Sequence, residues 1–233
     1  MESKGKSKKN NKRYRYNVQK EDAVFPYAFL GLSIGNTESL EKMKDAAIKT
    51  VTDFENLSNN FVSEDIIKLI KNDESSNSNE CDKQIQNNNS VWKFPRSFHI
   101  TTLFHSKNYN KNHEALKSFV DGKEVFISII GLAIIPNGLA TFIALTDEVV
   151  DNVYPHITFM IGKYKPKQSN DLLHALFDEG CPFYEQYQNI LNNKGTPLTD
   201  HCKIMMDNNE EEVYLKIFEK SLDIKGVMKG FKN

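Results

Sequence analysis

Residues 124–145 have the sequence EVFISIIGLAIIPNGLATFIAL, and this stretch decides the fold class. Its last twenty residues, 126–145, carry no charge and are long enough to resemble a membrane span. However, Pro136-Asn137-Gly138 interrupts them near the middle, and Asn-Gly between two β-prone arms is a strong hairpin signal. Each arm alone is too short to cross a bilayer. We therefore predict a buried β-hairpin and no membrane partner.

Further strands and helices are predicted on both sides of this hairpin. The predicted strands cover residues 25–34, 97–104 and 153–161, with one or two closing strands over 213–231. The predicted helices cover residues 64–71, 113–120 and 169–177, together with an earlier helix whose apolar residues recur at spacings of three and four, at Leu40, Met43, Ala47, Val51 and Phe54. Asn36 or Thr37 is expected to cap that first helix, and Ser169 or Asn170 the last. Strands that mix with helices around an antiparallel hairpin indicate an α+β fold.

Charge divides the chain unequally. The 233 residues include 30 Lys and Arg against 31 Asp and Glu, but residues 1–20 alone have eight basic residues and one acid. The tail thus has a net charge of +7, and residues 21–233 have 22 basic and 30 acidic groups, a net of −8. We predict a disordered basic tail over 1–20 that recruits RNA, directs nuclear import or only aids solubility. We expect residues 21–233 to form one domain, with a disordered polar insertion at 73–90.

The cysteines and the N-terminus bear on the compartment. The three cysteines are odd in number and form no Cys-x-x-Cys, so neither a disulfide framework nor a thiol zinc site is indicated. The N-terminus lacks the apolar stretch of a signal peptide. We expect an intracellular protein, cytoplasmic or nuclear, and treat it as a monomer.

The tripeptide His-Ile-Thr occurs twice, starting at His99 and at His156. Alternate residues of a strand share a face, so each histidine lies beside the hydroxyl of Thr101 or Thr158. The apolar neighbours are predicted to point away into a core: Phe98, Ile100, Phe104, Ile157, Phe159 and Ile161. The simpler interpretation is a pair of half-buried strand histidines, each hydrogen-bonded to its threonine. The duplication favours a functional pair.

Paired histidines and hydroxyls suit phosphodiester chemistry. Cleavage of an RNA-type phosphodiester or a 2′,3′-cyclic phosphate needs one group that deprotonates the attacking water and another that protonates the departing ribose oxygen. Histidine serves in both roles, because its ordinary pKa of about 6.5 allows either form near neutrality. Hydroxyls can donate hydrogen bonds to the phosphate oxygens. This chemistry requires no metal or other cofactor, and we expect none.

At these motifs the chain resembles the two-histidine (2H) phosphoesterase superfamily, and within it the cyclic phosphodiesterase domain of plant and fungal tRNA ligases. The second motif carries most of the likeness, as Tyr154-Pro155-His156-Ile157-Thr158, then Gly162 and the helix start at Asn170-Asp171-Leu172-Leu173; Ile224-Lys225-Gly226 is also similar. The resemblance implies a bilobal, pseudo-symmetric α+β fold. In that fold two antiparallel sheets flank a central cleft, with helices outside.

The resemblance also implies a function. It makes His99 and His156 the catalytic acid–base pair and Thr101 and Thr158 the phosphate-binding residues. The expected activity is hydrolysis of a 2′,3′-cyclic phosphate at an RNA or nucleotide end, giving a 2′-phosphate, in RNA processing, tRNA splicing or RNA repair. Two alternatives stay open: a phosphodiesterase acting on 2′-5′ or 3′-5′ oligonucleotides, and a catalytically silent nucleotide- or RNA-binding module. Which histidine is the base is also open.

Three further residues are candidates for substrate contact. Tyr27 and Tyr154 are aromatic residues that could stack on a base. Lys163 follows the second motif and could meet the RNA backbone. A core position for the tyrosines and a solvated loop for the lysine are the competing interpretations.

Overall fold

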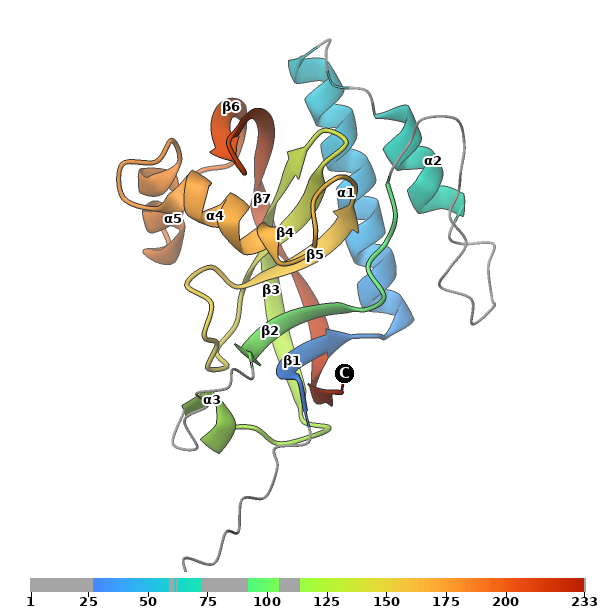
Figure 1. Cartoon of the computed structure of the whole chain (residues 1–233), viewed down its shortest axis with the longest axis vertical. Coiled ribbons are helices and arrows are strands. Elements are labelled where there is room, and N and C mark those ends of the chain that lie inside the picture. Colours follow the sequence, from blue (N-terminus) through green and yellow to red (C-terminus); the bar gives the residue numbers. More distant parts are fainter. Residues whose placement is uncertain (1–26, 59–60, 62, 73–91, 105–113, 233) are drawn as a thin grey trace, which may run out of the picture.

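The computed structural model describes residues 27–58, 61, 63–72, 92–104 and 114–232. In this part of the chain seven strands pair antiparallel and five helices pack around them, which confirms the α+β class (Figure 1). The predicted tail (1–20) and the predicted insertion (73–90) lie outside the described residues. No helix in the described ranges has the length and apolar character needed to cross a bilayer.

The strands have the order β2-β1-β7-β3-β4-β5, and β6 pairs with β7 beside this path. Their bounds are β1 Phe29–Ile34, β2 Phe98–Phe104, β3 Glu124–Ile135, β4 Leu139–Leu145, β5 His156–Ile161, β6 Leu198–Met206 and β7 Asn209–Phe231. The helices are α1 Thr37–Leu57, α2 Glu64–Asn72, α3 Glu114–Lys117, α4 Gln168–Phe177 and α5 Tyr184–Leu191. Hydrogen bonds join all seven strands into one sheet. The two-sheet, bilobal form that the family resemblance implies stays a prediction.

The predicted hairpin is confirmed as β3 and β4. The two strands pair up to Ile135 and Leu139, and Asn137 in the turn has a φ of 56°, in the left-handed region that Asn tolerates. Successive β3 residues enter different cores: Ile134 belongs to the core with α1, and Ile135 to the core with α4. Helices therefore cover this part of the sheet on both faces, as Figure 1 shows. Burial on both faces explains the long uncharged run.

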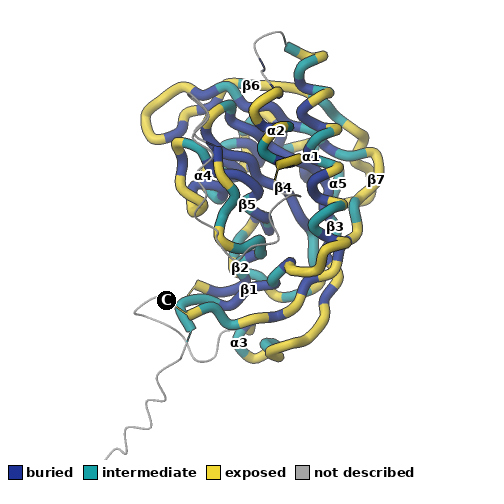
Figure 2. The backbone as a smooth tube through the Cα atoms, turned by 90° about the vertical axis from the view of Figure 1, so that its right-hand side faces the viewer, coloured by how far each residue is buried: buried dark blue, intermediate teal, exposed yellow. Residues whose placement is uncertain are grey.

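The first helix also follows its prediction. Asn36 accepts a hydrogen bond from the backbone N–H of Ser39 at 2.8 Å, which satisfies one of the free donors at the start of α1. Four of its five predicted apolar positions are buried, namely Met43, Ala47, Val51 and Phe54, and Leu40 is partly buried. Figure 2 shows this buried stripe facing the buried strands of the sheet.

In the C-terminal half the predicted cap of α4 is wrong and two elements were not predicted, whereas the closing segment agrees with the prediction of one or two strands. Neither Ser169 nor Asn170 caps α4; the N-cap residue is Lys167, which makes no side-chain capping bond, because the Ser169 hydroxyl bonds to two threonines instead. The sequence prediction also missed α5 and β6, and the closing segment is one 23-residue strand, β7. The turn between β6 and β7 contains Asp207 and Asn208, with φ angles of 48° and 65°, which suits a tight hairpin turn.

The pairing between the two longest strands, β3 and β7, is interrupted by an irregularity. Between β3 and β7, Ile129 pairs with Leu222 and Gly131 pairs with Ile217, so one residue of β3 is opposite four residues of β7. The sheet bends back so that its two end strands, β2 and β5, contact each other. These end strands carry the two His-Ile-Thr motifs.

The register break generates a prediction about stability. At Gly131 an added Cβ would lie 2.5 Å from the backbone oxygen of Lys216 on β7. Backbone at this distance cannot yield cheaply, so Gly131→Ala should lower the free energy of unfolding by about 1–3 kcal/mol in urea denaturation. Gly35→Ala is the matched control, because an added Cβ there meets no atom within 4 Å. Equal stability of the two variants would contradict the described pairing of β3 with β7.

Candidate active site

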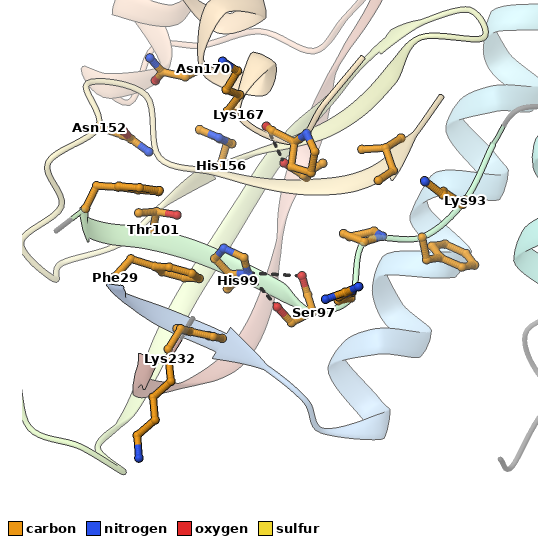
Figure 3. A pocket seen from close by; sticks show the side chains of 18 residues that line it. Phe29, Lys93, Ser97, His99, Thr101, Asn152, His156, Lys167, Asn170 and Lys232 are labelled. Atoms are coloured by element: carbon orange, nitrogen blue, oxygen red, sulfur yellow. Dashed lines mark hydrogen bonds between the residues drawn. The ribbon is translucent and has the colours of Figure 1, made fainter. Parts of the chain in front are cut away.

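A cavity of about 880 Å³ opens where β2 and β5 meet. Both histidines and both threonines of the repeated motif line it: His99, Thr101, His156 and Thr158. Figure 3 shows the two imidazoles on facing strands with Thr101 beside them. The fold thus brings together all four residues that the motif singled out.

Each motif strand contains a β-bulge directly after its threonine. On β2, Thr101 pairs with Gly31 and Leu103 pairs with Leu30, so one residue has no partner. On β5, Thr158 pairs with Thr141 and Met160 pairs with Ala140, which leaves one extra residue at the same place. A bulge shifts the alternation of side chains by one residue.

This shift corrects two predictions about the core. Phe104 and Ile161 were expected to point away from the histidines, yet both line the cavity. Each lies five residues after its histidine, and the bulge returns it to the histidine face. The Phe104 side chain is 67% exposed. The duplicated unit is therefore His-x-Thr-x-x-apolar, a longer pattern than the tripeptide.

Backbone carbonyls orient both imidazoles. His156 donates from Nδ1 to the carbonyl oxygen of Tyr154 at 2.8 Å. His99 Nδ1 lies 3.3 Å from the carbonyl oxygen of Ser97 and 3.2 Å from its hydroxyl. A carbonyl only accepts, so the proton is on Nδ1 and the neutral ring keeps a lone pair on Nε2.

The pKa of each imidazole is below its ordinary value of 6.5. Burial is the main cause for both, since it penalises the charged ring. A second positive charge adds to this effect, because His156 lowers the pKa of His99 and His174 lowers the pKa of His156. The hydrogen bonds to the backbone carbonyls of Ser97 and Tyr154 act in the opposite direction and raise the pKa of each ring. Two such rings hold fewer than two protons at neutral pH.

The hydroxyl of Thr158 is positioned by a short chain of hydroxyls. Buried Thr141 donates to Ser169 Oγ at 2.7 Å, and Ser169 Oγ lies 2.8 Å from Thr158 Oγ1. If Ser169 donates its hydrogen to Thr158 Oγ1, the Thr158 hydroxyl donates in turn to the carbonyl oxygen of Pro166 at 3.4 Å, a long bond that a phosphate oxygen can replace. Ser169 and Thr141 give no sequence signal, because neither belongs to a motif.

Three phenylalanines from three strands form a stack beside His99. Phe29 pairs across strands with Phe104 and with Phe231, and its ring centroid lies 5.9 Å and 4.4 Å from theirs, with interplanar angles of 10° and 9°. The imidazole of His99 lies 4.9 Å from the Phe29 ring and 5.0 Å from the Phe231 ring. This phenylalanine stack was not predicted, because its members are more than seventy residues apart in sequence and only the strand register aligns them.

All charged side chains that line the cavity are basic: Lys93, Arg96, Lys167 and Lys232. Within the described residues none of these four forms an ion pair, whereas seven other lysines do: Lys42, Lys44, Lys68, Lys123, Lys163, Lys203 and Lys216. The cavity is thus a positively charged site on a predominantly acidic body. None of the four is among the contact residues predicted from the sequence.

The three additional contact candidates do not line the cavity. Tyr154 is 5% exposed and donates from its hydroxyl to Asp178 at 2.9 Å; burial and this bond raise its pKa. Tyr27 lies against Phe119, with ring centroids 6.2 Å apart. Lys163 is bound to Glu211 at 2.7 Å. Tyr154 thus lies in the core and Lys163 has a carboxylate partner, and substrate contact by these three residues stays a prediction.

No group of three or more His, Cys, Asp or Glu side chains suited to a metal ion occurs among the described residues. The polar side chains that line the cavity are imidazoles, hydroxyls, cations and the amides of Asn152 and Asn170.

The geometry predicts how the histidines titrate. In NMR titrations of the imidazole signals, both histidines of the motif should have a pKa below 6.5. Since the charge of His156 contributes to the low pKa of His99, His156→Gln should raise the pKa of His99. His201→Gln is the control, because His201 is exposed on β6 and does not line the cavity. An unchanged pKa of His99 in His156→Gln would show that the two rings do not sense each other.

Comparisons with known proteins identify no family. No protein-family model matches the chain, and no curated protein matches it significantly. Among solved structures the chain is similar to a crystal structure of a fungal RNA kinase, with a TM-score of 0.40 and 12% sequence identity. The match covers 86% of this chain and 62% of that chain, less than two thirds of its length. A likeness this distant shows neither family nor activity, so a function has to come from the side chains of the cavity.

Proposed function

We propose that this protein is a two-histidine phosphoesterase that hydrolyses a 2′,3′-cyclic phosphate at the end of an RNA or nucleotide. One observation carries the proposal: two copies of His-x-Thr-x-x-apolar, each with a bulge after its threonine, line a single cavity from opposite ends of the sheet. A chance pair of core histidines has no reason to share this geometry.

The proposed reaction is an in-line displacement at phosphorus. The neutral histidine accepts a proton from water through Nε2 while the water oxygen forms a bond to phosphorus. The bond from phosphorus to one ribose oxygen breaks, and the protonated histidine gives its proton to that oxygen. After turnover the two histidines have exchanged protonation states, and solvent restores them. The family resemblance assigns the broken bond to O3′, which leaves a 2′-phosphate.

Hydroxyls and cations around the imidazoles support the charge that develops on the phosphate. Thr101 and Thr158 supply one hydroxyl from each motif strand. Lys167, just before α4, adds a positive charge to the same cavity lining. These groups need no metal to bind the phosphate, and they account for the expected nucleotide or RNA partner.

The bilobal, pseudo-symmetric form of the family belongs to the same proposal. Its support is the matching environment of β2 and β5, each an end strand paired on one side to a neighbouring strand with the same bulge. The register break that β3 and β7 share marks the boundary between the proposed halves.

Two measurements test this function: hydrolysis of a cyclic nucleotide in the absence of metal, and the loss of that activity when either histidine is replaced. The protein should hydrolyse adenosine 2′,3′-cyclic phosphate in EDTA, and His99→Ala and His156→Ala should each lower kcat/KM by at least about 10²-fold, the scale of positioned acid–base catalysis. His201→Ala should leave it unchanged. Circular dichroism checks that the variants are folded.

Two results would overturn the assignment. Full activity of either cavity variant would remove that histidine from the reaction, and complete dependence on added metal would replace the mechanism. Tight nucleotide binding without turnover would favour the silent binding module, and product analysis with 2′-5′ oligoadenylate tests the oligonucleotide alternative.

The pH dependence of kcat/KM follows from the two low pKa values. The base histidine is active when deprotonated, so the rate rises as pH increases through its pKa; the acid histidine is active when protonated, so the rate falls as pH increases through its pKa. Because both pKa values are below 6.5 in the free protein, the maximum should be below pH 6.5. A maximum above pH 7 would contradict these pKa directions.

A further inference from the structure

The cavity is chemically different on its two sides. Figure 3 shows Phe29 at one end and Lys93 at the other, with His99 and Ser97 between them. The phenylalanine stack lies on one side of the histidines, together with Lys232, and the segment with Lys93 and Arg96, which also contributes Phe94, lies on the other. The first side is thus mainly aromatic, and the second has two of the four cations.

The terminal ribose of an RNA also has an aromatic group on one side and an anionic group on the other. Its 2′ and 3′ oxygens carry the cyclic phosphate, C1′ next to C2′ carries the base, and C4′ next to C3′ carries the 5′ carbon and its phosphate. With the cyclic phosphate between the histidines, the base and the 5′-phosphate therefore leave in opposite directions.

We infer that the substrate is an RNA 3′ end whose terminal nucleotide carries a 5′-phosphate, with its base on the phenylalanine stack and that phosphate on Lys93 and Arg96. This inference rests on the proposed function and narrows it, since it makes a nucleoside 2′,3′-cyclic phosphate without a 5′-phosphate an inferior substrate.

The phenylalanine stack offers a flat apolar surface for a base. Phe104 is an exposed member, with a relative exposure of 67%, and its ring is nearly parallel to that of Phe29. Bases stack on aromatic rings whatever their identity, so the stack binds a nucleotide without selecting its sequence.

The cationic side is held in place by the sheet. Lys93 forms two backbone hydrogen bonds with Ile161 on β5, both 2.9 Å long, so its position is tied to the second motif. Neither Lys93 nor Arg96 forms an ion pair with a described residue, which leaves both charges available to an anion. Lys167 and Lys232 also line the cavity, so Lys93 and Arg96 are two cations more, while one cyclic phosphate has a single negative charge.

Matched substrates test the cationic side. The kcat/KM for adenosine 2′,3′-cyclic phosphate is compared with that for the same nucleotide bearing a 5′-phosphate and for a dinucleotide ending in the cyclic phosphate. The 5′-phosphate should raise kcat/KM on the order of tenfold or more, as expected for charge-assisted hydrogen bonds. In Lys93→Ala/Arg96→Ala this ratio should fall towards one.

The control for charge is Lys49→Ala/Lys220→Ala. These two lysines line a separate groove of about 580 Å³ beside α1 and β7, so the ratio should stay at its wild-type value. For the aromatic side, Phe104→Ala should raise KM for all three substrates, and Phe104→Tyr, which keeps the ring, should restore it.

The outcomes separate this inference from the function on which it rests. Turnover of all three substrates with equal kcat/KM, or a ratio that survives in Lys93→Ala/Arg96→Ala, would overturn the inference and leave the phosphoesterase intact. Absence of turnover with every cyclic phosphate would instead overturn the proposed function.

Discussion

The antiparallel pairing of β3 with β7 is the constraint on which the rest of the structure depends. These strands run through the whole sheet, from the pair Ile134 and Tyr214 to the pair Glu124 and Val227. One end of β7 carries β1 and β2, and the far edge of β3 carries β4 and β5. The strands with the histidines are therefore the two ends of one hydrogen-bonded path, and its curvature brings them together.

The β-bulges in β2 and β5 determine which side chains line the cavity beside the histidines. A regular strand would have turned Phe104 and Ile161 into the core. One extra residue after each threonine returns them to the histidine face, where Phe104 extends the phenylalanine stack and Ile161 holds Lys93 through its backbone. Local irregularity thus determines what surrounds the imidazoles, while the regular part of each strand determines where they point.

The basic side chains of the cavity differ from many of those elsewhere on the body. Seven described lysines outside the cavity form ion pairs with nearby carboxylates, and the exposed pairs among them add little stability. The cations of the cavity have no such partners among the described residues, so the field there is positive. The cavity differs from the rest of the body in that its described charged lining residues are all basic, whereas residues 21–233 have a net charge of −8.

The sequence by itself determined the hairpin over 124–145, the buried stripe of α1 and the repeated His-Ile-Thr, because these depend on local periodicity and residue chemistry. It did not distinguish Tyr154, which is core, from Phe104, which is exposed, since both are aromatic residues close to a motif. Only the tertiary structure decided that Phe29, Phe104 and Phe231 stack beside His99, and that Lys93 faces them across the cavity. Those contacts join segments far apart in the chain, and the register of the strands, bulges included, is what aligns them.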